Sequence, residues 1–272
     1  MSSKTLPLVS ITVPTYGQAK YLPMTLDAIW FQDYPNIEII VVNANSPDNT
    51  KEVLSAFAEA IDSETINYAK RFDREKNEVI RQSELRYPKT GRSLTIVNLD
   101  ADPGLSETYN VGLRKSNGMY IAAIVSDDLP HTSMVSELVL ALESGADFAY
   151  GDMFWVDDAG RIRRQMKFPE YDPTTCLADW YLMGSARMWR KKLHDTVGYM
   201  DPAYRSAHDY DLILRFAMSG AQFKHVPKTL YSVRLHGSER PTGNHTIERE
   251  PLVYSESKQI ALRAEKWLNA RK

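Results

Sequence analysis

Ile121-Ala122-Ala123-Ile124-Val125-Ser126-Asp127-Asp128 is an apolar stretch that ends in two adjacent carboxylates. Its apolar residues do not alternate with polar ones, which predicts a strand buried on both faces. Helix-like segments flank it on both sides, so we expect a central strand of a parallel α/β sheet. Ligands of open α/β sheets bind beyond the carboxyl ends of the strands, which is where the two carboxylates fall.

Asp127 and Asp128 admit two interpretations. Adjacent negative charges repel unless a cation lies beside them, so the pair suits a hard divalent ion, Mg²⁺ or Mn²⁺, that bridges to the phosphates of a ligand. The alternative is a polar cap for the helix expected after Leu129-Pro130, because Asp favours the first turns of helices.

The composition limits the class of protein. A length of 272 residues fits one α/β domain of ordinary size, and a formal net charge of −2 argues against a nucleic-acid binder. Cys176 is the only cysteine, which excludes an intramolecular disulfide and favours a reducing, cytoplasmic compartment. The polar residues 1–7 do not form a signal peptide, and no apolar run is long enough to suggest a membrane span.

The first 60 residues predict a β-α-β-α unit. We expect a strand over 8–13 that Pro14 stops, a helix over 20–32, a strand over 37–42, and a helix that Ser46 or Asp48 caps and that ends near residue 60. This Rossmann-like order places Thr15 and residues 43–46 on the ligand side.

Residues 61–92 are polar, heavily charged and weakly periodic. Most such segments are solvated helices or loops. The alternative is an excursion that folds over the ligand site and offers its arginines to phosphates, because the segment is longer than a minimal connection.

The remaining chain alternates between predicted strands and helices. Acidic Asp209 also suits the first turn of its helix, so a capping role is the alternative to a chemical one. The basic residues of 161–167 suit either an anion site or an exposed hairpin arm. The expected elements are strands over 93–99, 121–128, 146–156, 161–167, 184–189 and 228–235, and helices over 106–115, 133–143, 173–181, 190–197, 208–217 and from 251 onward.

Five segments in this order resemble motifs of the family 2 glycosyltransferases, inverting enzymes with the GT-A nucleotide-sugar fold. The resemblance extends from Val9 to Ser238 and is carried by residues 9–16, 32–42, 104–128, 208–212 and 234–238. It implies an α/β fold with a Rossmann-like, mostly parallel central sheet flanked by helices. A nucleotide-sugar-binding half over 1–128, an acceptor half over 129–240 and a tail helix over 241–272 would form a single domain.

The resemblance implies a metal-dependent transfer of a sugar from a nucleotide-diphosphate sugar to a hydroxyl of a saccharide or lipid-linked saccharide, in cell-surface polysaccharide or glycolipid synthesis. Asp128 and His236 would hold Mn²⁺ or Mg²⁺, and Asp209 would act as general base on the acceptor hydroxyl. The expected donor-binding residues are Pro14, Thr15, Tyr16, Asn43, Asn45, Ser106 and Asp127.

The sequence departs from the family in two places. The family's Asp-Asp-Gly-Ser becomes Asn43-Ala44-Asn45-Ser46, so the carboxylates expected near the base are absent, and His208 stands where the family more often has Glu. Asn43 can still form hydrogen bonds, whereas the side chain of Ala44 cannot. This departure motivates a second hypothesis, a catalytically silent nucleotide-sugar-binding module of the same fold.

A nucleotidyltransferase is a third hypothesis that residues 15–18 disfavour, because they supply no glycine-rich, basic triphosphate loop. The tail suits either packing on its own domain or peripheral contact with the inner membrane face, with Ile260, Trp267 and Leu268 as its apolar face. Four aromatic residues could stack on sugar rings or belong to the core: Trp155, Trp180, Tyr181 and Trp189.

Overall fold

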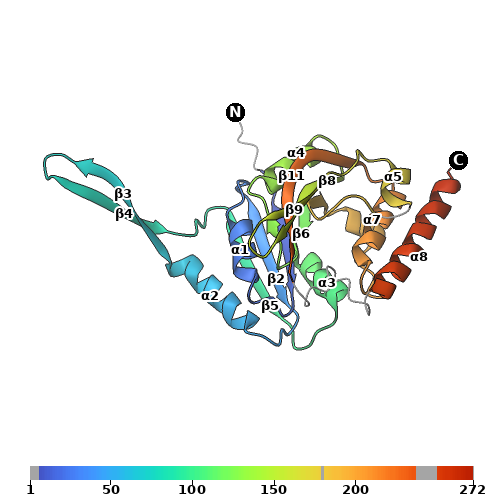
Figure 1. Ribbon diagram of the computed structural model, residues 1–272, viewed down its shortest axis with the longest axis horizontal. Helices are drawn as coiled ribbons and strands as arrows, with labels where there is room; N and C mark the ends of the chain where they lie inside the picture. The colour runs from blue at the N-terminus through green and yellow to red at the C-terminus, as the bar shows by residue number, and fades with distance from the viewer. Residues whose placement is uncertain (1–5, 179–180, 237–249, 272) are drawn as a thin grey trace.

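The computed structural model describes residues 6–178, 181–236 and 250–271. Within these ranges one nine-stranded sheet forms the centre of the molecule, with the strand order β5-β2-β1-β6-β10-β8-β11-β7 and with β9 paired to β8 (Figure 1). Its strands are β1 (Val9–Thr15), β2 (Ile37–Asn43), β5 (Arg92–Asn98), β6 (Tyr120–Ala123), β7 (Leu129–Pro130), β8 (Phe148–Asp157), β9 (Ile162–Met166), β10 (Arg187–Arg190) and β11 (Phe223–Leu235).

The N-terminal half of the sheet is parallel, as the sequence predicts. β1 lies between β2 and β6, with Val9 opposite both Ile37 and Tyr120, and β5 continues the parallel order beyond β2. Pro14 does not stop β1, because the pairing with β6 already ends where Thr12 faces Ala123. The missing N–H of proline therefore removes no bond from that ladder.

The C-terminal half of the sheet departs from the expected mostly parallel order. β10 runs antiparallel to both β6 and β8, β11 runs parallel to β8, and β7 runs antiparallel to β11. The strand of the opening stretch is also shorter than expected, because β6 ends at Ala123. Residues 124–128 form the turn that leads to β7, so Asp127 and Asp128 lie beyond the strand end.

Helices cover both faces of the sheet and bury two apolar clusters. One cluster contains buried side chains of α1 (Leu22–Trp30), α2 (Thr50–Ser63) and α4 (Met134–Glu143). The other contains side chains of α3 (Leu105–Lys115), α5 (Pro173–Leu177), α6 (Leu193–Val197), α7 (His208–Met218) and α8 (Glu250–Asn269). These helices confirm the prediction of helices from the spacing of apolar residues in the sequence.

The tail helix α8 packs on its own domain. Ile260 and Ala264 are fully buried against the cluster of α5 and α7, and Trp267 is partly buried beside them. Of the apolar face considered for membrane contact, Ile260 is therefore covered, whereas Trp267 and Leu268 are partly buried. Among the helices of the described residues, none combines the length and apolar character that crossing a bilayer requires.

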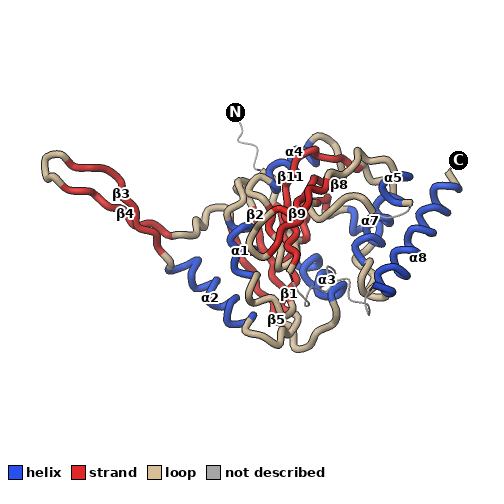
Figure 2. The backbone as a smooth tube through the Cα atoms, viewed as in Figure 1, coloured by secondary structure: helices blue, strands red, loops and turns tan. Residues whose placement is uncertain are grey.

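Residues 61–92 contain a β-hairpin that projects from the body, as Figures 1 and 2 show. β3 (Thr65–Asp73) and β4 (Glu78–Leu85) pair antiparallel in a sheet of their own. The expectation of a solvated segment is confirmed, but its elements are strands and not helices or loops, and the segment does not fold over the ligand side. Its apolar side chains, such as Phe72 at 55% and Val79 at 51% exposure, stay in solvent, and so the segment carries no amphipathic pattern.

The root of the hairpin is fixed to the body by buried and charged contacts. The Tyr87 hydroxyl donates to Asp27 Oδ1 at 2.7 Å, and its ring packs edge-on against Trp30 and Phe57. Arg86 forms ion pairs with Asp27 at 3.0 Å and with Glu64 at 2.9 Å. The fixed root separates the exposed hairpin from the domain core.

Candidate functional site

The carboxyl ends of β1, β2 and β5 meet at a loop that Asn43 organises. Its Nδ2 donates to Asn98 Oδ1 at 2.9 Å, and its Oδ1 accepts the backbone N–H of Ser46 at 3.0 Å. The Ala44 N–H donates to the carbonyl of Thr15 at 3.0 Å. Both ends of the Asn43 amide are thus engaged within the protein. Asn98 was missed in the sequence, although it ends the neighbouring strand.

Polar side chains also join the first two loops. Ser46 Oγ accepts the N–H of Gly17 at 3.1 Å, and Asp48 accepts the N–H groups of Ala19 and Thr50 at 3.0 and 3.1 Å. Burial alone would raise the pKa of Asp48, but these bonds and that from the Thr50 hydroxyl hold it below its ordinary value. Neither expected cap residue is the N-cap of α2, which is Asn49.

The expected donor-binding residues of these loops divide into exposed and buried ones. Tyr16 is 46% exposed, and Asn45 is exposed with a left-handed φ of 54°. Pro14 and Thr15 are buried, and Thr15 Oγ1 has no hydrogen-bond partner among the described residues. Tyr16 and Asn45 are therefore the side chains that a nucleotide can reach without displacing the core.

Asp127 and His236 come together from positions 109 residues apart. His236 Nε2 lies 2.8 Å from Asp127 Oδ2, and the two side chains are 2% and 1% exposed. The ring of Tyr21 stacks on His236 with a centroid separation of 4.2 Å and an interplanar angle of 26°. The imidazole is thereby held against the carboxylate at the end of β11.

Asp128 is engaged differently from its neighbour. Its Oδ1 accepts the backbone N–H of Arg234 at 3.0 Å, and its carbonyl accepts the Thr25 hydroxyl at 2.8 Å. The Arg234 guanidinium donates through Nε to the carbonyl of Asp127 at 3.0 Å. The structure therefore places His236 beside Asp127, whereas the expected metal pair was Asp128 and His236. Asp128 instead joins the turn to β11.

The chemistry of this pair fits a divalent cation that completes its shell with phosphate and water. Mg²⁺ and Mn²⁺ take one or two protein carboxylates, and imidazole suits Mn²⁺ better than Mg²⁺. Asp127 and His236 supply one carboxylate oxygen and one imidazole nitrogen within 2.8 Å. No group of three or more His, Cys, Asp or Glu side chains suited to a metal occurs among the described residues. A metal bound by Asp127 and His236 would therefore need phosphate or water to complete its coordination shell.

Asp209 lies at the first turn of α7 within a hydrogen-bonded group. Its Oδ2 accepts the Tyr181 hydroxyl and Arg187 Nη2, both at 2.8 Å, and its Oδ1 accepts the N–H of Tyr210 at 2.8 Å. Burial would raise the pKa of Asp209, but the charge of Arg187 and the hydrogen bonds outweigh burial and hold the pKa below its ordinary value. The carboxylate is therefore ionised at neutral pH.

Tyr109 of α3 is a buried side chain beside His208. Burial raises the pKa of its hydroxyl, the Arg187 charge lowers it, and the charges of Asp209, Asp128 and Asp127 raise it further. The ring of His208 lies 5.7 Å from that of Tyr109. Burial lowers the pKa of His208, whose Nδ1 has no hydrogen-bond partner in the described part of the chain. Tyr109 was not identified in the sequence.

The segment before α7 is held by the tail helix. Glu256 of α8 accepts the backbone N–H groups of Arg205, Ser206 and Ala207 at 3.0, 2.8 and 2.9 Å. Its carboxylate thereby caps the helix that carries Asp209 and interacts favourably with the dipole of that helix. No local sequence pattern predicts this contact, because Glu256 lies about 50 residues beyond its partners in the chain.

Ser106 does not occupy its expected position as a helix cap. The N-cap of α3 is Gly104, whose φ of 85° favours glycine, and Ser106 lies inside the helix. Its hydroxyl donates to the carbonyl of Tyr204 at 2.7 Å, so it joins α3 to the segment before α7. This contact directs Ser106 toward the acceptor side, in contrast to its expected role at the donor.

The other candidate residues lie outside these contacts. Arg161 and Arg163 both pair with Asp157 on an exposed hairpin, which agrees with the exposed-arm interpretation. Trp189 is buried in the core, and Arg164 covers the ring of Trp155. Trp180, Gly237 and Ser238 lie outside the described residues.

Comparisons with known proteins agree with this arrangement. Residues 10–84 match the model of Glycosyl transferase family 2. The chain is 26% identical over 256 residues to chondroitin synthase of Pasteurella multocida (strain Pm70), covering 90% of this chain and 22% of that protein. It spans between 21% and 41% of the length of the first curated relatives that it matches.

Solved structures share the fold. S. aureus TarS 1–349 in complex with UDP-GlcNAc has a TM-score of 0.69 and 17% identity, covering 94% of this chain and 66% of that one. The mannosyltransferase PcManGT from Pyrobaculum calidifontis, in complex with GDP-Man and Mn²⁺, has a TM-score of 0.61 and 16% identity, covering 98% and 75%. These structures show that the architecture is the GT-A fold. The resemblance of the chain to the family 2 glycosyltransferases is carried by residues 10–84.

Proposed function

We propose that the protein transfers a sugar from a nucleoside-diphosphate sugar to a hydroxyl acceptor with inversion at the anomeric carbon. The observation that carries this proposal is the buried contact of His236 Nε2 with Asp127 Oδ2 at 2.8 Å, beyond the strand end of the GT-A fold. A transfer of this kind needs two functions at once, neutralisation of a departing diphosphate and removal of a proton from the acceptor.

Asp127 and His236 are the residues that would hold Mn²⁺ or Mg²⁺. When bound, the ion supplies a Lewis acid and a template for the diphosphate. The mixed carboxylate and imidazole donors support Mn²⁺ in particular. The structural neighbour PcManGT was solved with GDP-Man and Mn²⁺, which supports the same combination of donor and ion here.

Asp209 would accept the proton of the attacking hydroxyl. Its lowered pKa keeps it ionised at neutral pH, and the bonds from Tyr181 and Arg187 fix the orientation of Oδ2. General base catalysis of this kind contributes about 10²–10⁴-fold in rate. An attack in line with the leaving diphosphate inverts the configuration of the sugar.

Tyr16 and Asn45 are the proposed contacts to the nucleotide, because both are exposed beside the loop that Asn43 organises. The bound donors of the structural neighbours are UDP-GlcNAc and GDP-Man. A saccharide or lipid-linked acceptor in polysaccharide or glycolipid synthesis is supported by the chondroitin synthase relative and by a PGL/p-HBAD biosynthesis glycosyltransferase that is 24% identical over 235 residues. The lone, buried Cys176 supports a cytoplasmic location.

The test is release of nucleoside diphosphate from UDP-GlcNAc and from GDP-mannose, each with Mn²⁺ and with a chelator. We expect release with one donor, loss of release with the chelator, and loss in Asp127→Asn. Release that is unchanged in both Asp127→Asn and Asp209→Asn would refute the proposal. Glu59→Gln is a matched control, because Glu59 is an exposed carboxylate on α2.

A silent donor-binding module is the second candidate, and Asn43-Ala44 in place of two carboxylates is the observation that favours it. Calorimetric donor binding without release of nucleoside diphosphate would support the module. In that case Asp209→Asn would leave the affinity for the donor unchanged.

A further inference from the structure

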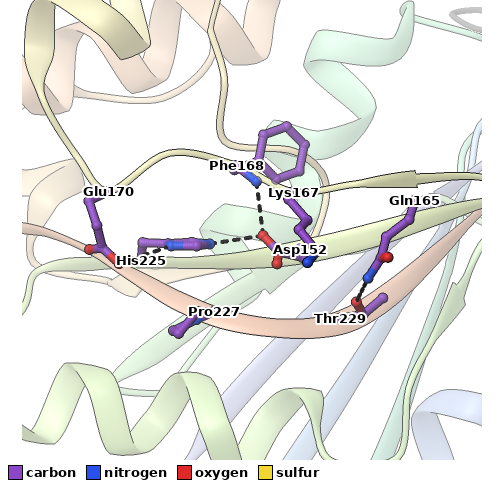
Figure 3. Close-up of a pocket in the computed structure, with 8 residues that line it drawn as sticks. All are labelled: Asp152, Gln165, Lys167, Phe168, Glu170, His225, Pro227 and Thr229. Atoms are coloured by element: carbon purple, nitrogen blue, oxygen red, sulfur yellow. Dashed lines mark hydrogen bonds and ion pairs between the residues drawn. The ribbon is translucent and has the colours of Figure 1, made fainter.

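A cavity of about 400 Å³ opens on the sheet away from the residues considered so far. Its lining comes from β8, β9, β11 and the segment after β9, as the close-up in Figure 3 shows. The volume lies in the lower part of the range, about 300–1,000 Å³, of small-molecule sites. None of its lining residues belongs to the pair of Asp127 and His236 or to the hydrogen-bonded group around Asp209.

The cavity lies beside an irregular part of β11. The register between β11 and β8 shifts between Val226 and Thr229 and again between Thr229 and Tyr231. Pro227, which lines the cavity, has no N–H for a regular ladder. Such bulges re-aim side chains and are frequent beside functional sites. The strand therefore opens here for a local structural reason.

The polar groups of the cavity are oriented before any ligand arrives. Asp152 Oδ1 accepts the N–H of Phe168 at 2.9 Å and lies 2.9 Å from His225 Nε2. His225 Nδ1 lies 3.2 Å from Glu170 Oε1. Asp152 and His225 are buried, at 5% and 7% exposure, so these bonds fix their positions. The dashed lines in Figure 3 mark the Asp152 contacts.

The opposite part of the lining contains an amide and a hydroxyl, which can form hydrogen bonds with a ligand. Gln165 Nε2 donates to Thr229 Oγ1 at 3.2 Å, and Lys167 stands beside them. An amide and a hydroxyl can each donate and accept. The ring of Phe168 adds an apolar surface to this polar lining.

The charges of the lining select the class of ligand. Asp152 and Glu170 disfavour an anion, because a second negative charge would be repelled beside a buried carboxylate. Lys167 disfavours a cation in the same way, and no set of three metal-binding side chains occurs in the described part of the chain. A neutral ligand with many hydroxyl groups satisfies donors and acceptors together.

The cavity is joined to the acceptor side through one glycine. Phe168 covers Gly184, whose φ of 55° and close approach to the Phe168 ring leave no room for a side chain. The carbonyl of Gly184 accepts Arg187 Nη1 at 3.4 Å, and Arg187 holds Asp209. The segment 184–187 thus contacts both Phe168 of the cavity and the proposed base, Asp209.

We propose that this cavity is a subsite for a neutral sugar unit of the acceptor, separate from the unit that receives the transferred sugar. The proposal rests on the proposed glycosyl transfer. Gln165 and Thr229 would bind its hydroxyls, and Phe168 would contact its ring carbons. An acceptor longer than one sugar would then be held at two points.

The experiment measures binding of glucose, mannose, galactose and N-acetylglucosamine to the full chain by saturation-transfer NMR, without donor. We expect at least one sugar to bind and Gln165→Ala to weaken it by about 3- to 10-fold, the effect of losing one hydrogen bond. Thr229→Val is the second variant and should weaken the same sugar. Gln222→Ala is the matched control, because Gln222 is exposed outside the cavity and its side chain donates to the carbonyl of Gly220 at 3.1 Å.

Two outcomes overturn the subsite: no sugar of this panel binds, or Gln165→Ala and Thr229→Val bind as the wild type does. Release of nucleoside diphosphate is measured separately on the same preparations. Its absence from the wild type would refute the glycosyl transfer itself, whereas normal release without sugar binding would refute the subsite alone.

Discussion

The donor and acceptor ends of the site are held in place by different forces. At the donor end, neutral amides and hydroxyls join neighbouring loops, as in the contact of Asn43 with Asn98 at 2.9 Å, and the carboxylate of Asp48 accepts backbone N–H groups of both loops. At the acceptor end, charged groups bond to one another and to backbone, as in the pair of Arg187 and Asp209 and the cap by Glu256. The first end depends on adjacent strands, and the second on elements far apart in the chain.

The contrast between neutral and charged contacts matches the different ligands that the two ends would bind. The hydrogen bonds of Asn43 and Ser46 are neutral, so they add no charge beside a base or a ribose. A buried ion pair costs desolvation but fixes a carboxylate in one orientation, which a proton acceptor needs. The acceptor end is therefore more sensitive to the loss of a single charge.

Replacement of the proposed base should have the largest effect. In Asp209→Asn we expect kcat to fall by about 10²–10⁴-fold, because the amide cannot take the proton. Donor affinity should be unchanged, and calorimetry checks this. Equal losses of donor affinity and kcat would place Asp209 at the donor end and break the comparison.

Replacement of Asp127, the proposed metal-binding carboxylate, should have the second-largest effect. In Asp127→Asn we expect turnover to fall on the order of 10³-fold, since a Lewis acid contributes several kcal/mol. Donor affinity should fall as well, in contrast to the result for Asp209→Asn. Titration of Mn²⁺ in the assay should show a higher requirement for the ion. Asp128→Asn tests the alternative ligand, and a larger effect there would favour the pair expected from the sequence.

The cap by Glu256 should contribute to stability. We expect Glu256→Ala to lower the free energy of unfolding by about 3 kcal/mol, because three backbone N–H groups lose a buried charged acceptor. Urea unfolding measures this change. Glu265→Ala is the control, because Glu265 is exposed on the same helix. Equal effects of the two variants would mean that the cap does not hold the acceptor end.

The pH dependence should shift when Arg187 is replaced. The pKa of Asp209 lies below its ordinary value of 3.8, so the base form persists as the pH falls from neutrality toward that value. The stabilisation from the ion pair is present above the unfolded pKa and is lost as the pH falls through the folded one. In Arg187→Gln the effect of burial loses its strongest opposing group, so the pKa of Asp209 should rise and the acid limb of kcat should move to higher pH. An unmoved limb would mean that Asp209 does not set it.

Removal of the hairpin should have the smallest effect. Joining Thr65 to Leu85, which face each other in the hairpin, through Asn-Gly shortens the arm and retains its register. The free energy of unfolding should change by no more than about 0.5 kcal/mol, as for surface changes, and donor turnover should be kept. Loss of donor binding would show that this segment reaches the nucleotide after all.

Local patterns in the sequence predicted most of the sheet and helices, because each of these elements buries one face. The hairpin was missed since Ile66, Phe72 and Val79 are exposed and provide no contrast between faces. The resemblance predicted a late histidine near an acidic turn. Which carboxylate it meets depends on how β11 aligns with residues 124–128, and no local pattern encodes that alignment.

The position of Glu256 in the chain has a consequence for the order of folding. All four parallel strands of the donor end lie within residues 9–123, so that sheet can form while later residues are still being synthesised. The cap on α7 has to wait for residue 256 to leave the ribosome. The nascent chain would thus acquire its donor end early, and docking of α8 would be the step that completes the acceptor end.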